Sequence, residues 1–255
     1  MAVDSRGEPR IPIDEATRVL VVTGAGISAE SGLATFRGAG GLWEGHRVED
    51  VATPEGFAAD SALVWRFYSA RRTAALAAQP NAAHRALAAL ERRIGDRLLV
   101  VTQNVDGLHR RAGCERLIEI HGSLFRTRCT HCTRPPFADE ALHEAEVPAC
   151  ELCAGRGRRA YLRPDIVWFG ELLDSDHLGR VEAFAEQGPG RRLVFVAVGT
   201  SGNVWPVAGF VDLAASAGGE TWLVNLDPAG NAWRFDRVVR GPAAELLPGL
   251  LGVGE

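Results

Sequence analysis

The hydrophobic positions of this chain fall into short continuous runs and do not alternate with polar ones. Five runs rich in Val, Leu and Ile cover residues 19–22, 97–101, 117–120, 193–198 and 222–226. Runs of this length and composition are typical of strands that are buried on both faces of a parallel sheet. Each run is followed by glycine or by small polar or imidazole side chains. The pattern therefore predicts a parallel sheet whose loops carry polar groups.

The segments between these runs predict helices. Residues 54–79, 82–93 and 175–187 have helical composition, and a further helix-like segment begins near Ser28. Residues 38–53 are rich in glycine and polar side chains and predict a long loop over the nucleotide site, with no second strand of the sheet of the kind found in dehydrogenases. Because apolar strands alternate with helices, we expect an α/β fold with a doubly wound sheet.

A glycine-rich turn follows the first apolar run. Gly24, Ala25 and Gly26 stand between that run and Ser28. Glycine lets the backbone turn sharply and approach a ligand closely, and the free N–H groups at the start of a helix attract anions. The turn therefore predicts a site for the diphosphate of a nucleotide. On its own, so short a motif also fits a βα turn that binds nothing.

Polar side chains follow two other runs. Gln103, Asn104 and Asp106 come after the second run, and His121 comes after the third. Loops at the carboxyl ends of parallel strands meet at one edge of the sheet, where ligands bind. These four side chains are therefore candidates for a ligand site. Asn and Asp also stabilise turns, so Asn104 and Asp106 have that alternative role.

Four cysteines form two pairs with the spacing of a metal site. Two residues separate Cys129 from Cys132 and Cys150 from Cys153, and 17 residues lie between the pairs. This spacing predicts a zinc ribbon in which four thiolates hold one Zn²⁺ ion. Because four thiolates leave no coordination position open, the zinc would be structural and not catalytic.

Composition limits the kinds of function. Of 255 residues, 46% are hydrophobic and 24% are charged, and the formal net charge is −4. This charge gives no electrostatic basis for binding nucleic acid or an anionic membrane. The polar N-terminus lacks the features of a secretory signal, and no stretch is long and apolar enough to span a bilayer. We therefore expect a cytoplasmic protein.

Seven motifs, taken in order, resemble those of the sirtuin family. They are GAGISAESG with the following Phe36 and Arg37, QNVDGLH at 103–109, IHGS at 120–123, the two cysteine pairs, VWFGE at 167–171, GTSG at 199–202 and NLD at 225–227. The resemblance covers about residues 17–247. It implies an NAD-dependent protein-lysine deacylase that yields nicotinamide, O-acyl-ADP-ribose and free lysine.

The resemblance also implies a division of the chain. Residues 11–125 and 161–250 would form a Rossmann-like NAD-binding domain, with a cofactor loop and helical module at 38–83. Residues 126–160 would form a small inserted zinc module. The substrate would enter the cleft between the two parts.

Individual roles follow from the same resemblance. His121 would be the general base, because imidazole titrates in the range needed to take a proton from a ribose hydroxyl. Asn104 would act beside it as a second catalytic residue. The implied NAD-binding residues are Gly24, Ala25, Gly26, Ser28, Phe36, Arg37, Gln103, Asn104, Asp106, Gly199, Thr200, Ser201, Asn225, Asp227 and Ala243.

Tyr68 and Arg71 resemble a pair found in class III sirtuins, which remove acidic acyl groups. Residues three apart on a helix share a face, so the phenol and the guanidinium point to the same side. Arginine presents a planar fork that matches a carboxylate. Ala52 would widen the acyl pocket. The resemblance therefore implies removal of succinyl and malonyl groups, and of acetyl groups as well.

The substrate is expected to bind as an extended peptide. Val167 and Phe169 would contact it, and the acyl-lysine segment would lie as a strand between the backbone of residues 169–172 and that of residues 202–204. Such pairing involves mainly main-chain atoms, so selectivity for peptide sequence would be loose. We expect the protein to be a monomer.

Two other functions remain open at this point. A mono-ADP-ribosyltransferase would use the same activated ribose carbon and would leave ADP-ribosylated protein in place of O-acyl-ADP-ribose. A non-catalytic protein that senses NAD and uses the zinc ribbon as a binding module would show no turnover.

Overall fold

A six-stranded parallel sheet organises the larger part of the molecule. The computed structural model describes residues 10–35, 42–186 and 191–253, and its strand order is β11–β10–β9–β1–β4–β5. The chain adds strands to one side of β1 and then to the other, so the order reverses beside β1. The strands are β1 (Thr17–Thr23), β4 (Leu98–Thr102), β5 (Leu117–Glu119), β9 (Arg192–Val198), β10 (Glu220–Asn225) and β11 (Arg237–Arg240).

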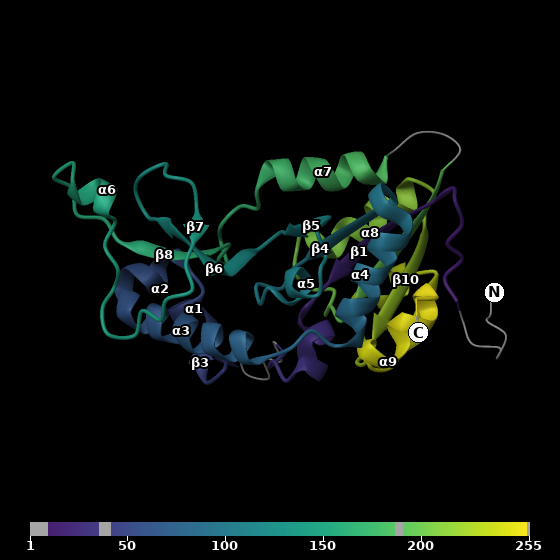
Figure 1. Cartoon of the computed structure of the whole chain (residues 1–255), viewed down its shortest axis with the longest axis horizontal. Coiled ribbons are helices and arrows are strands. Elements are labelled where there is room, and N and C mark those ends of the chain that lie inside the picture. The colour runs from purple at the N-terminus through teal and green to yellow at the C-terminus, as the bar shows by residue number, and fades with distance from the viewer. Residues whose placement is uncertain (1–9, 36–41, 187–190, 254–255) are drawn as a thin grey trace.

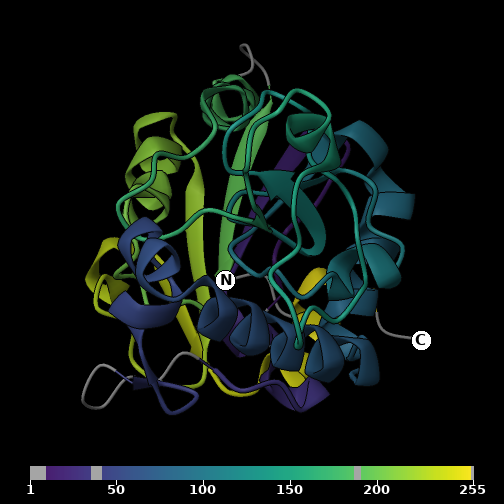
Figure 2. The ribbon, with the colours of Figure 1, turned by 90° about the vertical axis from the view of Figure 1, so that its left-hand side faces the viewer.

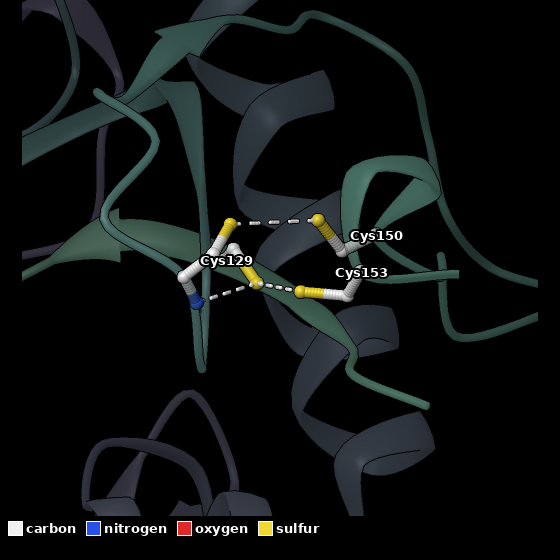
Figure 3. Close-up of side chains that lie close together, drawn as sticks. Cys129, Cys150 and Cys153 are labelled. Atoms are coloured by element: carbon white, nitrogen blue, oxygen red, sulfur yellow. Dashed lines mark hydrogen bonds between the residues drawn. The ribbon is translucent and has the colours of Figure 1, made fainter. Parts of the chain in front are cut away.

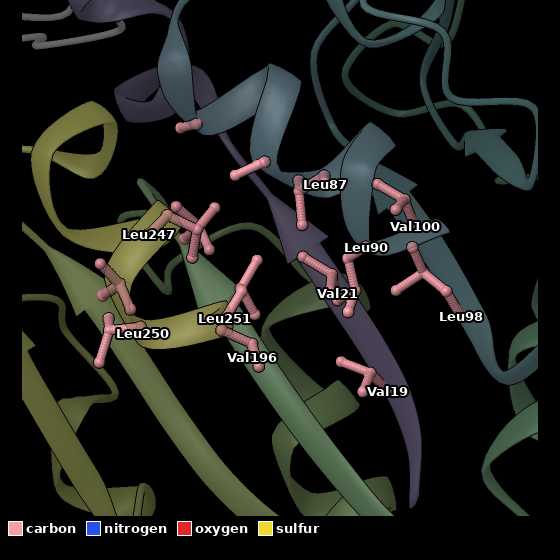
Figure 4. Packing of buried hydrophobic residues seen from close by; sticks show 14 of the residues in the cluster. Val19, Val21, Leu87, Leu90, Leu98, Val100, Val196, Leu247, Leu250 and Leu251 are labelled. Carbon is pink, nitrogen blue, oxygen red and sulfur yellow. The ribbon is translucent and has the colours of Figure 1, made fainter. Parts of the chain in front are cut away.

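Helices cover both faces of this sheet. Val19 and Val21 of β1 contribute to one apolar cluster, while Leu20 and Val22 contribute to the other, as expected when successive side chains of a strand alternate. The first cluster includes side chains of α4 (Ala82–Ile94) and α9 (Ala243–Leu251), as Figure 4 shows. The second includes side chains of α7 (Ser175–Ala185) and α8 (Phe210–Ser216). The predicted doubly wound α/β fold is therefore confirmed.

A smaller part lies beside this sheet, at the left of Figure 1 and nearest the viewer in Figure 2. It contains a three-stranded antiparallel sheet of order β7–β6–β8, a two-stranded hairpin and several helices. The elements are β2 (Leu42–Trp43), β3 (His46–Arg47), α1 (Val48–Val51), α2 (Pro54–Ala59), α3 (Ser61–Ala77), β6 (Gly122–Cys129), β7 (Phe137–Ala138), α6 (Glu151–Ala154) and β8 (Leu162–Ile166).

The helices of the smaller part share an apolar core with its three-stranded sheet. Trp65 of α3 is fully buried, and its indole N–H donates to the Leu162 carbonyl at 3.0 Å. Arg72 of α3 is also buried and donates from Nε to the Leu124 carbonyl at 2.6 Å. Since β6 begins at Gly122 and β8 ends at Ile166, this sheet extends across both predicted boundaries of the zinc module.

The structure adds detail to three of the sequence predictions. The helix predicted over 54–79 is two helices, because Asp60 leaves the helical conformation and its side chain caps α3 by accepting from Leu63 N. The segment near Ser28 is a 3₁₀ helix, Ala25–Ser31, that ends at Gly32 with φ 84°. The 38–53 segment is predicted to supply no second strand of the main sheet, and none of its described residues, 42–53, joins that sheet, although they include the separate β2–β3 hairpin.

A sixth strand of the main sheet was missed. Strand β11 has the sequence RVVR, and three of its four side chains are exposed because it lies at the sheet edge. A short edge strand lacks the long apolar run that identifies buried strands. The remaining short elements are α5 (Leu108–Arg111) and the 3₁₀ turns Gly95–Arg97, Val207–Gly209 and Ala232–Arg234. Within the described residues, no helix is long and apolar enough to cross a membrane.

Candidate active site

A cleft of about 1670 Å³ lies between the carboxyl ends of the main strands and the smaller part. Ligand pockets usually enclose about 300–1,000 Å³, so this cleft has room for more than one small ligand. Phe36 and Arg37 lie outside the described residues. All the other predicted cofactor, substrate and catalytic residues line the cleft: Gly24, Ala25, Gly26, Ser28, Ala52, Tyr68, Arg71, Gln103, Asn104, Asp106, His121, Val167, Phe169, Gly199, Thr200, Ser201, Asn225, Asp227 and Ala243.

The glycine turn after β1 packs directly on the loop after β9. Gly26 N donates to Gly199 O at 2.8 Å. A Cβ atom on Gly24 would lie 2.8 Å from Gly199 O, and one on Gly26 would lie 2.6 Å from Gly199 Cα. The glycines are therefore needed for the two loops to approach, and the approach holds the backbone at the floor of the cleft.

Ser28, Asn104 and Asp106 form a buried hydrogen-bonded group. Asn104 Nδ2 donates to Ser28 Oγ at 3.0 Å and to Gly24 O at 3.2 Å. Ser28 Oγ in turn donates to Asp106 Oδ2 at 2.7 Å, while Asp106 Oδ1 accepts from Leu108 N. The network joins the glycine turn to the loop after β4. It fixes the Asn104 amide with Oδ1 as its remaining acceptor.

Two further contacts tie the strand-end loops together. Gln103 Nε2 donates to Thr200 Oγ1 at 3.1 Å, and Asn225 Nδ2 donates to the carbonyls of Thr200 and Asp227. The loops that follow β4, β9 and β10 are therefore held in one arrangement. The prediction that the loops after the parallel strands converge at one edge of the sheet is confirmed.

His121 directly precedes β6, and a hydrogen bond to the backbone determines its tautomer. Its Nδ1 lies 3.1 Å from the Gln103 carbonyl oxygen, which can only accept, so Nδ1 carries the proton and Nε2 the lone pair. Burial lowers the pKa of His121 below its ordinary value of 6.5, against the opposing effect of the hydrogen bond to Gln103. The ring is therefore neutral at pH 7, with a basic nitrogen in the cleft.

Tyr68 is fully buried in the wall of the cleft. Its hydroxyl accepts a hydrogen bond from Trp168 Nε1 at 3.0 Å. Burial raises the pKa of Tyr68 to about 12, although the nearby Arg71 charge opposes this shift. The phenol therefore keeps its proton, and with the indole donating to its oxygen that proton is available for another acceptor.

Arg71 lies one helical turn further along α3, with its guanidinium 4.0 Å from the ring centroid of Trp43. Burial lowers the pKa of Arg71, and the carboxylates of Glu44 and Asp106 oppose that effect. Glu44 Oε1 lies 3.9 Å from Arg71 Nε. Among the described residues, no group forms a hydrogen bond with the buried Nη1 of Arg71. A buried donor without a partner lowers the stability of the protein. An anionic ligand that accepts a hydrogen bond from this donor removes that penalty.

Several residues that line the cleft were not predicted. Trp43, Glu44 and Trp168 all line it, and none of the three is among the predicted site residues. The VWFGE motif contains Trp168, so its position there could have been used. Nothing in the sequence predicts the two-residue hairpin that brings Trp43 and Glu44 to Arg71, because each strand has only two residues.

The four paired cysteines form a separate cluster between β6 and α6 (Figure 3). Their sulfur atoms lie within 4.8 Å of one another, and the pairs Cys129–Cys153 and Cys132–Cys150 have S···S distances of 3.8 Å. A tetrahedral zinc ion with Zn–S bonds of ~2.3 Å implies S···S distances of about 3.8 Å. The geometry therefore fits one structural Zn²⁺ ion, as the spacing predicts.

The fold and the cleft define a class: an α/β protein with a ligand cleft at the switch point of a doubly wound sheet and an inserted four-cysteine module. The chain belongs to the Sir2 family, whose sequence profile matches residues 24–206. The sirtuin resemblance is therefore confirmed.

Known proteins resemble the chain over nearly its whole length. An NAD-dependent protein deacylase of Salmonella typhimurium strain LT2 is 47% identical over 238 residues, which cover 92% of this chain and 82% of that protein. A solved Sir2 homolog–NAD complex has a TM-score of 0.82 and 37% identity, covering 95% of this chain and 94% of the other. A Sir2–p53 peptide–NAD⁺ structure has a TM-score of 0.76 and 28% identity, covering 90% of each chain.

Proposed function

We propose that this protein is an NAD-dependent protein-lysine deacylase that removes succinyl and malonyl groups and also acetyl groups. Its family membership and the deacylase relatives support the general activity. The preference for acidic acyl groups rests on one observation, the buried Arg71 Nη1 without a hydrogen-bond partner beside the Tyr68 hydroxyl.

The residues around the cleft suit NAD. Bound NAD supplies an electrophilic ribose carbon and nicotinamide as its leaving group. The backbone of Gly24–Ser28, which packs closely against Gly199 and contributes to the lining of the cleft, would hold the diphosphate. Asn104 and Asp106 would bind the nicotinamide half, and Asn225 and Asp227 the adenosine half. The solved Sir2 homolog–NAD complex supports NAD as the ligand of the cleft.

His121 would act as the general base. His121 lines the cleft, and because its Nδ1–H is held by the Gln103 carbonyl, its Nε2 lone pair is the one left to take a proton. Burial keeps the ring neutral, which a base requires. Asn104 Oδ1, held by the donation of its amide to Ser28, would accept from a hydroxyl or an amide of the bound ligand.

The acyl group would enter the pocket lined by Ala52, Tyr68 and Arg71. A terminal carboxylate there would accept from the Arg71 fork and from the Tyr68 hydroxyl, which keeps its proton. Ala52 leaves space for the longer chain, and its carbonyl accepts from Phe169 N at 3.0 Å, so it is held against the predicted peptide segment. An acetyl group would fit without using the fork.

The peptide backbone would lie between residues 169–172 and 202–204, as an added strand. Phe169 and Leu172 from the first segment and Val204 from the second line the cleft. The Sir2–p53 peptide–NAD⁺ neighbour supports binding of a peptide beside NAD. Main-chain pairing of this kind predicts loose selectivity for peptide sequence.

Nicotinamide release from NAD with matched acetyl-lysine and succinyl-lysine peptides tests the proposal. We expect turnover with both peptides, with higher kcat/KM for the succinyl form, and O-acyl-ADP-ribose with an equimolar amount of free lysine by mass spectrometry. ADP-ribosylated protein without free lysine would support the transferase alternative. The absence of turnover with every acyl peptide would support the non-catalytic alternative.

A further inference from the structure

We propose that Glu44 sets the balance between acidic and neutral acyl groups by acting as an internal counter-ion that an acidic acyl group must displace from Arg71. This inference rests on the proposed function, in which Arg71 binds the acyl carboxylate. It assigns to Glu44 a specificity role that the sequence motifs do not indicate.

The contact is short enough for an ion pair but leaves most of the fork available. Glu44 Oε1 is 3.9 Å from Arg71 Nε, whereas the buried Nη1 has no partner among the described residues. The side chain of Arg71 is only 16% exposed and that of Glu44 is 36% exposed. The carboxylate of Glu44 can therefore move toward solvent, while the guanidinium cannot.

The hairpin presents Glu44 in an unusual backbone conformation. Glu44 and Gly45 form the two-residue turn between the paired Trp43 and His46, with φ values of 50° and 84°. Glu44 is the one residue other than glycine with positive φ in the part of the chain that the structure describes. Asn, Asp or Gly is preferred at such a position, so local backbone preference does not explain a glutamate there.

The same hairpin brings a second contact to the guanidinium. The ring of Trp43 stacks on Arg71 at 4.0 Å, and Phe67 of α3 packs edge-on against both Trp43 and His46. Phe67 thus anchors the hairpin over the helix that carries Arg71. Aromatic stacking from Trp43 and a carboxylate from Glu44 meet on one cation.

The negative charge of Glu44 beside Arg71 favours binding of the acetyl group and disfavours binding of the succinyl group. A neutral acetyl group leaves Arg71 paired with Glu44, so the pocket is not left with an uncompensated charge. A succinyl carboxylate at the free Nη1 shares the same cation with Glu44 and is repelled by the Glu44 carboxylate unless that carboxylate moves away. Asp106 also acts on Arg71, but its oxygens are engaged with Ser28 and Leu108 N. Of the two carboxylates that act on Arg71, that of Glu44 is therefore the one that can move.

The test is the ratio of kcat/KM for succinyl-lysine to kcat/KM for acetyl-lysine peptides in Glu44→Gln. We expect this ratio to rise about tenfold, mainly through a lower KM for the succinyl peptide and a higher KM for the acetyl peptide. Glu44→Asn, which suits positive φ and also lacks the charge, should change the ratio in the same direction. Opposite effects of the two variants would show that hairpin geometry and not charge is responsible, and would overturn the inference.

Glu49→Gln is the matched control, because Glu49 forms an ion pair with the exposed Arg47 and is not among the residues that line the cleft in the described part of the chain. It should leave the ratio unchanged. In an Arg71→Met background, Glu44→Gln should no longer alter the ratio. If Arg71→Met lowers the ratio but Glu44→Gln in the native background does not raise it, the inference fails and the proposed function stands. If neither variant alters the ratio, the proposed preference for acidic acyl groups fails as well.

Discussion

The indole N–H of Trp168 donates to the Tyr68 hydroxyl at 3.0 Å, and the Arg163 guanidinium lies 3.3 Å from the centroid of the same indole ring. Arg163 is itself held by both carboxylate oxygens of Glu171, one of which also accepts from Trp168 N. The VWFGE segment thus fixes the orientation of the Tyr68 hydroxyl through the hydrogen bond from Trp168. Two motifs that are about 100 residues apart in the chain act on one acyl pocket.

Trp168→Phe should weaken the handling of acidic acyl groups selectively. Phenylalanine keeps the ring but removes the donor, so the Tyr68 hydroxyl loses its fixed orientation. We expect kcat/KM for a succinyl-lysine peptide to fall about 3- to 10-fold, the usual worth of a neutral hydrogen bond, and kcat/KM for the acetyl peptide to change less. Equal losses with both peptides would argue that Trp168 serves general packing only.

Arg71→Met should have the larger effect on the same comparison. Removal of a charge-assisted pair costs roughly 2–3 kcal/mol, so desuccinylation should fall by about 10²-fold, while deacetylation falls much less. Steady-state nicotinamide release with the two peptides measures both values. Arg66→Met is a suitable control, because Arg66 lies on the exposed face of the same helix. Equal losses on both acyl groups in Arg71→Met would rule out the carboxylate-binding role.

The parts of the fold that sequence predicts well are those specified by local pattern. The strands around Val21 and Val196 are continuous apolar runs that lie buried in the centre of the sheet. The apolar pattern alone therefore predicts that they are buried. The cysteine cluster is equally local, because the CxxC spacing determines which sulfurs can meet. Positions of polar residues at strand ends follow from the topology of parallel sheets.

The parts that could not be predicted depend on contacts between distant segments. The glycines at 24 and 26 predict a close approach of a ligand to the backbone, and the structure also places Gly199 against them. Arg71 and its neighbour Arg72 read alike in sequence, yet Arg72 bonds β6 inside the core while Arg71 faces the cleft. Only the tertiary packing of α3 distinguishes a structural arginine from a candidate binding residue.

Removal of zinc should disorder the cysteine cluster and lower activity without unfolding the main sheet. Within the described residues, the core around Cys129, Cys150 and Cys153 contains little else that is apolar, so the metal supplies most of its stability. Because β6 begins beside His121 and β8 ends beside Val167, disorder in the cysteine cluster should also disturb the positions of these two cleft residues. We expect one zinc per chain by native mass spectrometry.

Cys153→Ser tests this coupling directly. The apparent Tm should fall by roughly 10 °C or more, and hydrogen exchange should increase in residues 129–162 while β1 and β9 stay protected. Cys114→Ser is the matched control, since Cys114 is buried against the main sheet and lies outside the cluster. Full protection of residues 129–162 in the zinc-free protein would contradict a structural role for the metal.

The pH dependence of deacylation should follow His121. The base acts when neutral, and burial lowers the pKa of His121 below 6.5. The rate should therefore rise with pH to a plateau, and the midpoint of this rise should lie below pH 6.5. His121→Asn retains an N–H that can reach the Gln103 carbonyl but has no basic atom at the Nε2 position. It should lower free-lysine formation by about 10²–10⁴-fold and abolish the acid limb. The measurement is lysine release by mass spectrometry from pH 5 to pH 9 at saturating NAD and peptide. An unchanged acid limb in the variant would assign the ionisation, and with it the proton transfer, to another group.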